Sequence, residues 1–227
     1  MKKISILMTA GLLFLLFSGF GVTSSAAVKK LTVPCDQEKL ESGEIQVFTH
    51  RYTLKDGGEG KRVIGIMLLD APPAQVWKVL ENWDAMGPYV KSLKYYKTIH
   101  VINPVSDIAS GVSLIEGKLK VGILSFLYTL RVTFDRVGYS QEWRMLTSDE
   151  IVDCKKQQIP IRDSSASIKD IRGFEYIEPY GDGSKTIYWY APVVEVSGLV
   201  PGWVERAISK SSLNEYMEAV RKMVQSQ

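Results

Sequence analysis

The chain has 227 residues, of which 28 are lysine or arginine and 25 are aspartate or glutamate, giving a formal net charge of +3. The two signs are interspersed. No basic stripe of the kind that contacts a phosphate backbone occurs, so nucleic acid is not an expected partner. Hydrophobic residues make up 45% of the sequence, which is enough apolar material for one folded domain with its own core.

The first 27 residues have the pattern of a secretory signal peptide. Lys2 and Lys3 precede an uncharged apolar stretch at 4–22, and residues 25–27 are small, as a signal peptidase requires. We expect cleavage after Ala27 and a periplasmic or secreted protein. The alternative is an uncleaved membrane anchor, because the apolar stretch is long enough to span a bilayer. Removal of residues 1–27 would lower the formal net charge to +1.

Only two cysteines are present, Cys35 and Cys154. In an oxidising compartment they could form a disulfide that ties the start of the mature chain to its middle. The alternative is two unpaired thiols, because sequence spacing cannot give the Cα separation that a bridge needs. No metal site is predicted, since these cysteines, His50 and His100 lack the spacing of a ligand set.

A strand pair opens the predicted domain, residues 45–227. Residues 28–44 before it are polar, and we expect an N-terminal tail or a first short helix there. Residues 45–54 alternate as a half-buried strand does, the glycines of 55–60 suit a turn, and residues 62–69 form the second strand.

A helix is predicted after the second strand, because two prolines at its start suit a first helical turn. Its apolar residues recur at three- and four-residue spacing and form one stripe: Val76, Trp77, Leu80 and Trp83. The helix is broken near Gly87 and Pro88, and a short helical turn should follow before Leu93.

The middle of the chain is rich in strands. Six further stretches have strand character: 94–102, 112–121, 124–137, 141–146, 171–177 and 186–196. Consecutive strands joined by short turns predict an antiparallel meander rather than βαβ units. The polar residues 153–169 are expected to form a long loop or an irregular strand.

The C-terminal region predicts a second helix, from 200–203 to about residue 224. Four of its apolar residues share one face: Leu213, Met217, Val220 and Val224. The residues around Trp203 fall on a different face. Either both sides of one long helix are covered or the helix kinks near 211–212.

Three marks occur in this order: D-A-P-P-A-Q-V-W at 70–77, G-F-E-Y at 173–176 with G-D-G-S-K-T at 181–186, and V-P-G-W at 200–203. Together they resemble the START-like helix-grip superfamily (SRPBCC), which includes polyketide cyclases and coenzyme Q-binding START-like proteins. The resemblance implies an α+β fold. A curved antiparallel sheet would wrap around a long C-terminal helix, with one or two short helices after the second strand and a cavity between sheet and helix.

Alternation along the strands predicts which side chains would line this cavity. Between residues 124 and 134 one face is wholly apolar, and it should point toward the helix. Aromatic and methionine side chains suit such a cavity, although each could simply pack the core. The predicted lining is Trp77, Phe126, Tyr128, Leu130, Val132, Trp143, Met145, Phe174, Tyr176, Trp203, Leu213 and Met217.

Three functions follow from this picture. The first is binding or transport of an apolar small molecule or lipid in the cell envelope, by a monomer without a cofactor and with a transient membrane contact. The second is a cyclase, hydratase or lyase, which needs a general acid or base inside the cavity. The third is an envelope adaptor whose core is filled by side chains.

The charged residues of the strands decide between the first two functions. Most of them are expected on the solvent face: Arg131, Glu142, Arg144, Arg172 and Glu175. No G-x-S-x-G or H-E-x-x-H motif occurs, which disfavours nucleophilic and metal-dependent hydrolysis. The sequence therefore favours a binder, with an enzyme as the alternative.

Overall fold

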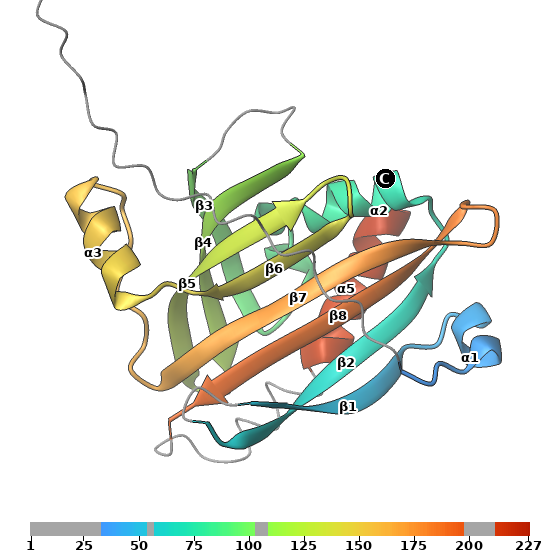
Figure 1. The fold of residues 1–227 in the computed structure, drawn as a ribbon, viewed down its shortest axis with the longest axis horizontal. Helices are drawn as coiled ribbons and strands as arrows, with labels where there is room; N and C mark the ends of the chain where they lie inside the picture. The colour runs from blue at the N-terminus through green and yellow to red at the C-terminus, as the bar shows by residue number, and fades with distance from the viewer. Residues whose placement is uncertain (1–32, 54–56, 103–108, 198–211) are drawn as a thin grey trace, which may run out of the picture.

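The framework of the protein is a curved antiparallel sheet (Figure 1). The computed structural model describes residues 33–53, 57–102, 109–197 and 212–227. Their strands are β1 (Gln46–Thr53), β2 (Glu59–Leu69), β3 (Leu93–Val101), β4 (Ser110–Val121), β5 (Leu124–Asp135), β6 (Ser140–Met145), β7 (Ile168–Tyr180) and β8 (Lys185–Val196). The sheet order is β1-β2-β8-β7-β6-β5-β4-β3, so the last strand lies between the first hairpin and the meander.

Helices cover both faces of this sheet. They are α1 (Gln37–Glu41), α2 (Pro73–Leu80), the 3-10 turns η1 (Trp83–Ala85) and η2 (Gly87–Tyr89), α3 (Ser148–Lys156) and α5 (Ser212–Gln225). In Figure 1, α2 and α5 lie behind the sheet, on its concave side, and α1 and α3 lie at opposite ends. This is the predicted α+β helix-grip architecture.

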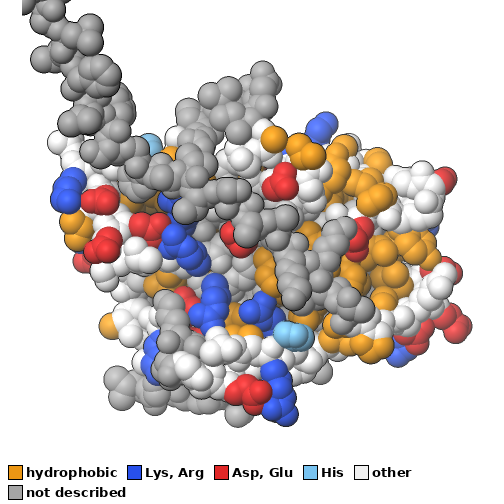
Figure 2. Space-filling view, viewed as in Figure 1, with side chains coloured by type: hydrophobic (Ala, Val, Ile, Leu, Met, Phe, Trp, Pro, Cys, Tyr) orange, Lys and Arg blue, Asp and Glu red, His pale blue; other side chains and the backbone are white. Residues whose placement is uncertain are grey.

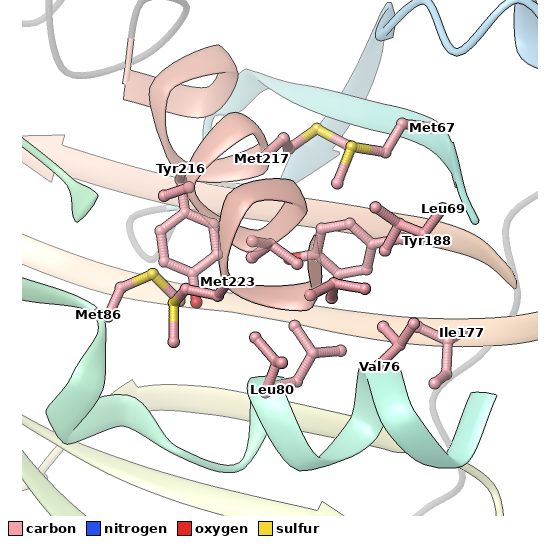
Figure 3. Packing of buried hydrophobic residues seen from close by; sticks show 14 of the residues in the cluster. Met67, Leu69, Val76, Leu80, Met86, Ile177, Tyr188, Tyr216, Met217 and Met223 are labelled. Carbon is pink, nitrogen blue, oxygen red and sulfur yellow. The ribbon is translucent and has the colours of Figure 1, made fainter. Parts of the chain in front are cut away.

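The C-terminal helix is held by an apolar face that the sequence pattern predicted. Leu213, Met217, Val220 and Val224 are buried together with side chains of α2 and β2. Figure 3 shows Met217 of α5 beside Met67 of β2. A Cβ atom on Gly65 would lie 2.1 Å from the Sδ of Met217, so glycine at this position lets the helix approach the strand closely.

The D-A-P-P motif builds the corner between β2 and α2. Pro73 occupies the first turn of α2, as predicted, and Pro72 precedes it in an extended conformation. The buried hydroxyl of Thr186 donates a hydrogen bond of 2.6 Å to the carbonyl oxygen of Ala71. The first strand pair is thereby fastened to β8. The helix ends at Leu80, and Trp83 lies in η1.

The expected loop at 153–169 is partly wrong, because α3 occupies residues 148–156. Thr147 and Glu150 form a capping box at its first turn, in which each side chain bonds the other residue's backbone N–H. The helix buries only Cys154. It therefore lacks the apolar stripe by which sequence periodicity reveals a helix.

The described part of the N-terminal segment lies against the convex face of the sheet. Leu40 of α1 is buried in a cluster with Ile64, Ile66 and Trp189, so the expected short helix is present. In the part of the chain that the structure describes, no helix is long and apolar enough to cross a membrane. The predicted signal peptide, residues 1–27, lies outside the described residues.

Candidate functional site

A cavity of about 460 Å³ lies between the concave face of the sheet and α5. Its described walls come from all eight strands, from the segment that follows η2 and from the start of α5. Aliphatic side chains such as Val90, Leu119, Leu130 and Ile171 contribute to these walls. The cavity therefore has the volume and the apolar character of a small-molecule site.

Aromatic rings form much of the cavity wall. Tyr190 stacks on Tyr216 of α5 with ring centroids 4.5 Å apart, and on its other neighbour Trp143 at 5.7 Å. Tyr96 and Tyr128 meet edge to face at 6.5 Å. Glycine makes room for one of these rings, because a Cβ on Gly173 would lie 2.5 Å from Cζ2 of Trp143.

Four tyrosine hydroxyls are among the polar groups of this cavity. The hydroxyl of Tyr128 donates a hydrogen bond of 3.4 Å to that of Tyr96. The hydroxyls of Tyr190 and Tyr216 have no hydrogen bond to any other described residue. Burial raises the pKa of Tyr96 to about 12 and raises the pKa values of the other three well above their ordinary value. All four therefore offer neutral hydroxyls, which can orient a ligand that carries an oxygen or nitrogen atom.

One carboxyl points to the concave side, contrary to expectation. Glu175 is fully buried and accepts hydrogen bonds from Nε2 of Gln141 and from the hydroxyl of Tyr188. Oε1 of Gln141 in turn accepts a bond of 3.1 Å from Nε1 of Trp83. Burial raises the pKa of Glu175 to about 7, although both hydrogen bonds to its carboxylate lower it. The predicted solvent-facing orientation is wrong for this residue, because two polar neighbours satisfy its oxygens inside.

The arginines of the strands lie on the convex face, as expected. Arg131, Arg144 and Arg172 are directly opposite one another on β5, β6 and β7. Glu150 lies 2.7 Å from Arg144 and 3.6 Å from Arg131, and Asp170 pairs with Arg172. Figure 2 views this face, on which basic and acidic side chains are interspersed. These ion pairs neutralise the three neighbouring arginines, whose presence on the convex face is thereby explained by structure.

The structure separates the predicted lining residues into groups. Tyr128, Leu130 and Trp143 border the cavity. Phe126 and Val132 are buried on the same face of β5, and Met145 packs against their cluster. The alternation on β5 and β6 was thus assigned to the correct face.

Five other predicted lining residues do not border the cavity, and a sixth is not described. Trp77, Leu213 and Met217 pack in the core between α2, α5 and the sheet. Trp203 lies outside the described residues. Phe174 packs against the convex-face cluster that contains the buried Tyr176.

The predicted orientation of Phe174 and Tyr176 toward the helix is wrong. Tyr176 stacks on Trp189 with centroids 5.3 Å apart and on Phe174 at 6.4 Å, all on the convex side. The physical reason is the inward position of Glu175, because neighbouring residues of a strand point to opposite faces. On this part of β7 the polar residue faces the concave side and the aromatic residues face the convex side, which is the opposite of what alternating hydrophobicity predicts.

Four tyrosines that border the cavity were not predicted from the sequence: Tyr52, Tyr96, Tyr190 and Tyr216. Tyr190 shares its strand face with Tyr188, and this period of two was the available signal. Tyr216 lies next to Met217 on the helical stripe, at its edge.

Cys35 and Cys154 are both free thiols in the structure. Cys35 is exposed just before α1, and Cys154 is buried in α3, at the other end of the sheet (Figure 1). Of the two alternatives, the structure therefore shows unpaired cysteines and no bridge. Burial raises the pKa of both thiols.

Comparison with solved structures identifies the fold. The Zhui aromatase/cyclase of a Streptomyces species matches with a TM-score of 0.55 at 13% identity, over 72% of this chain and 93% of its own. A START superfamily protein of Mycobacterium smegmatis matches with a TM-score of 0.54 at 12% identity, over 74% and 99%. The chain has a START-like helix-grip fold.

A third match supports the same assignment of the START-like fold. A protein of Thermus thermophilus has a TM-score of 0.53 at 11% identity, over 73% of this chain and 97% of its own. No family model matches the sequence, and no curated protein matches it. The similarity therefore establishes the fold, and the function has to be argued from the cavity.

Proposed function

We propose that this START-like protein binds an apolar small molecule or lipid in its cavity and carries it in the cell envelope. The observation behind this proposal is a cavity of about 460 Å³ whose wall combines aliphatic and aromatic side chains with a smaller number of polar and charged ones. Pockets of such size and lining are typical of small-molecule sites. The cavity argues against an adaptor with a filled core, because side chains that packed this space would add stability to the fold.

The tyrosines add a requirement for the ligand. Two stacked rings, Tyr190 and Tyr216, present hydroxyls that make no hydrogen bond within the described residues. Because both residues border the cavity, a ligand oxygen or nitrogen atom could bond to these hydroxyls. We therefore propose a ligand that is mainly apolar with a few polar atoms.

Two tryptophans provide a matched test of this proposal. Trp143 borders the cavity, whereas Trp189 is similarly buried on the convex face. The neutral dye N-phenylnaphthylamine should bind to the wild type with enhanced fluorescence. Trp143→Ala should weaken binding about tenfold, because a lost aromatic contact costs on the order of 1 kcal/mol or more. Trp189→Ala should leave binding unchanged.

A loss of dye binding in Trp143→Ala alone would support a ligand site in the cavity. Absence of dye binding to the folded wild type, or an equal loss in both variants, would contradict a ligand site in this cavity. If the dye does bind in the cavity, native mass spectrometry and lipid analysis of the purified protein would identify the class of natural ligand from any molecule that co-purifies in stoichiometric amount.

A cyclase-type enzyme is the second candidate, and Glu175 is the observation that favours it. Its carboxyl is buried on the concave side, with a pKa raised to about 7 by burial, which suits a general acid or base. However, both oxygens already accept hydrogen bonds, and Glu175 is not among the residues that border the cavity. Catalysis would require Glu175→Gln to abolish turnover of a bound substrate without weakening its binding.

Export to the envelope is proposed from the sequence of residues 1–27. The basic start, the apolar stretch and the small residues before Val28 support a cleaved signal peptide. The intact mass of the protein from a periplasmic fraction should correspond to a chain beginning at Val28. A full-length chain in the membrane fraction would instead indicate an uncleaved anchor.

A further inference from the structure

The sheet opens next to the cavity, between β2 and β8 (Figure 1). These strands pair from Leu69 with Thr186 to Gly65 with Tyr190, and no pairing continues beyond that point. Pro192 follows on β8 and has no N–H to donate to a neighbouring strand. The remaining residues of both strands are thus released from each other.

The cavity extends into this opening. Lys61 and Val63 of β2 border it from one side, and Val194 of β8 borders it from the other. Tyr52 and Arg62 also border the cavity. By alternation from Ile64 and Ile66 of the convex cluster, both of these side chains belong to the convex face. The cavity therefore reaches the outer face between the two strands.

The opening carries more positive than negative charge. Its acidic residues are already paired, since Glu59 lies 2.6 Å from Arg51 and Glu195 lies 3.0 Å from Arg172. Its remaining cations are Lys61, Arg62 and Lys169, and none of them has an ion-pair partner among the described residues.

Arg62 is the most buried cation of this opening. Its guanidinium lies over the rings of Tyr52 and Phe174, at 5.2 and 5.5 Å from their centroids. Its buried Nε atom has no hydrogen-bond partner. Burial lowers the pKa of Arg62, and repulsion from Arg172 adds to this. A negative group at the opening would offset both effects.

We propose that the ligand is an anionic amphiphile, whose carboxylate or phosphate head lies at this opening against Lys61, Lys169 and Arg62. Its apolar tail passes between Val63 and Val194 and extends along the tyrosines of the cavity. This assignment rests on the proposed function, because it specifies the ligand of the same cavity. An anionic amphiphile would account for a cavity with many apolar side chains whose entrance carries cations, one of them partly buried.

Competition with the neutral dye tests the assignment. Lauric acid and lauryl phosphate carry the anionic head, whereas lauryl alcohol and laurylamine have the same tail with a neutral and a cationic head. Both anionic competitors should displace the dye from the wild type at lower concentrations than the alcohol. This advantage should decrease at high salt, because exposed lysines are screened.

Two double variants isolate the effect of the entrance. Lys61→Gln with Lys169→Gln should reduce the advantage of the anionic competitors about threefold to tenfold, as expected for two exposed charges. Lys78→Gln with Lys222→Gln removes the same charge from exposed positions that do not border the cavity. This control should keep the wild-type advantage, and the dye should bind equally to all three proteins.

The outcomes separate the two proposals. If the dye binds but the anions compete no better than the alcohol, or if both double variants behave alike, the anionic ligand is refuted while an apolar site stands. A preference for only one of the two anions assigns the head group. If the dye does not bind to the folded wild type, the proposed function fails together with this inference.

Discussion

Substitution of Glu175 by glutamine tests the account of the buried carboxyl. The amide has nearly the same shape and can satisfy both neighbours. Its oxygen can accept from Gln141, and its NH₂ group can donate to the hydroxyl oxygen of Tyr188. Glu175→Gln therefore removes the titration of this site without leaving a buried polar atom unpaired.

The magnitude follows from the two pKa values. Burial raises the pKa of Glu175 from 4.5 to about 7 in the folded protein. Below pH 4.5 the carboxyl is protonated in both states, and its stabilising contribution is complete. As pH rises to about 7, the unfolded chain releases a proton that the folded protein keeps, so stability falls. Integration over this range gives a loss of about 3 kcal/mol.

The assay is urea unfolding followed by tryptophan fluorescence, for the wild type and the variant, from pH 4.5 to pH 8. The stability difference between them should grow by about 3 kcal/mol in favour of Glu175→Gln. At neutral to alkaline pH this corresponds to a melting temperature roughly 6–12 °C higher for a chain of this size. Glu142→Gln, which removes an exposed carboxyl from the adjacent strand, should reproduce the wild-type pH dependence. A parallel pH dependence of wild type and Glu175→Gln would refute the reasoning.

Three further predictions concern packing and the cysteines. Gly65→Ala should destabilise the protein by about 1–3 kcal/mol, because its Cβ would lie 2.1 Å from Sδ of Met217. The same substitution should lower the free energy of unfolding by less in a Met217→Ala background, and additive losses would contradict a direct contact between residues 65 and 217. Thr186→Val should lower the free energy of unfolding by about 1–3 kcal/mol, measured by chemical unfolding, because the carbonyl oxygen of Ala71 loses its hydrogen-bond donor. An unchanged free energy of unfolding would show that this 2.6 Å bond does not hold the corner between β2 and α2. Thiol titration of the denatured, unreduced protein should find two free thiols, and the native protein should react faster at exposed Cys35 than at buried Cys154. A count of zero would show a disulfide instead.

The sequence was sufficient where local periodicity reports a single face. The apolar stripe of α5 and the alternation along β5 both predicted the buried side correctly, because each element packs one face against the same core. The turn glycines and the proline-led start of α2 fixed the order of the elements. These local signals, with the motifs at 70–77 and 181–186, were enough for the helix-grip fold.

The candidate site was only partly accessible from the sequence. Tyr128, Leu130 and Trp143 were predicted, whereas Tyr190 and Tyr216 come from elements that meet only across the cavity. The capped helix α3 was missed because it contributes one buried side chain to the protein. Strand β7 was assigned to the wrong face because Glu175 points inward.

The sequence by itself thus determined the elements, their order and the faces that bury apolar side chains. Only the tertiary structure decided that β8 lies beside β2, that pairing of the two strands ends at Gly65 and Tyr190, and that Glu175 is enclosed by Gln141 and Tyr188. The physical reason is that periodicity arises from neighbours along one chain segment. Strand order, a gap in a sheet and the partners of a buried charge depend on residues that are distant in sequence and meet only on folding.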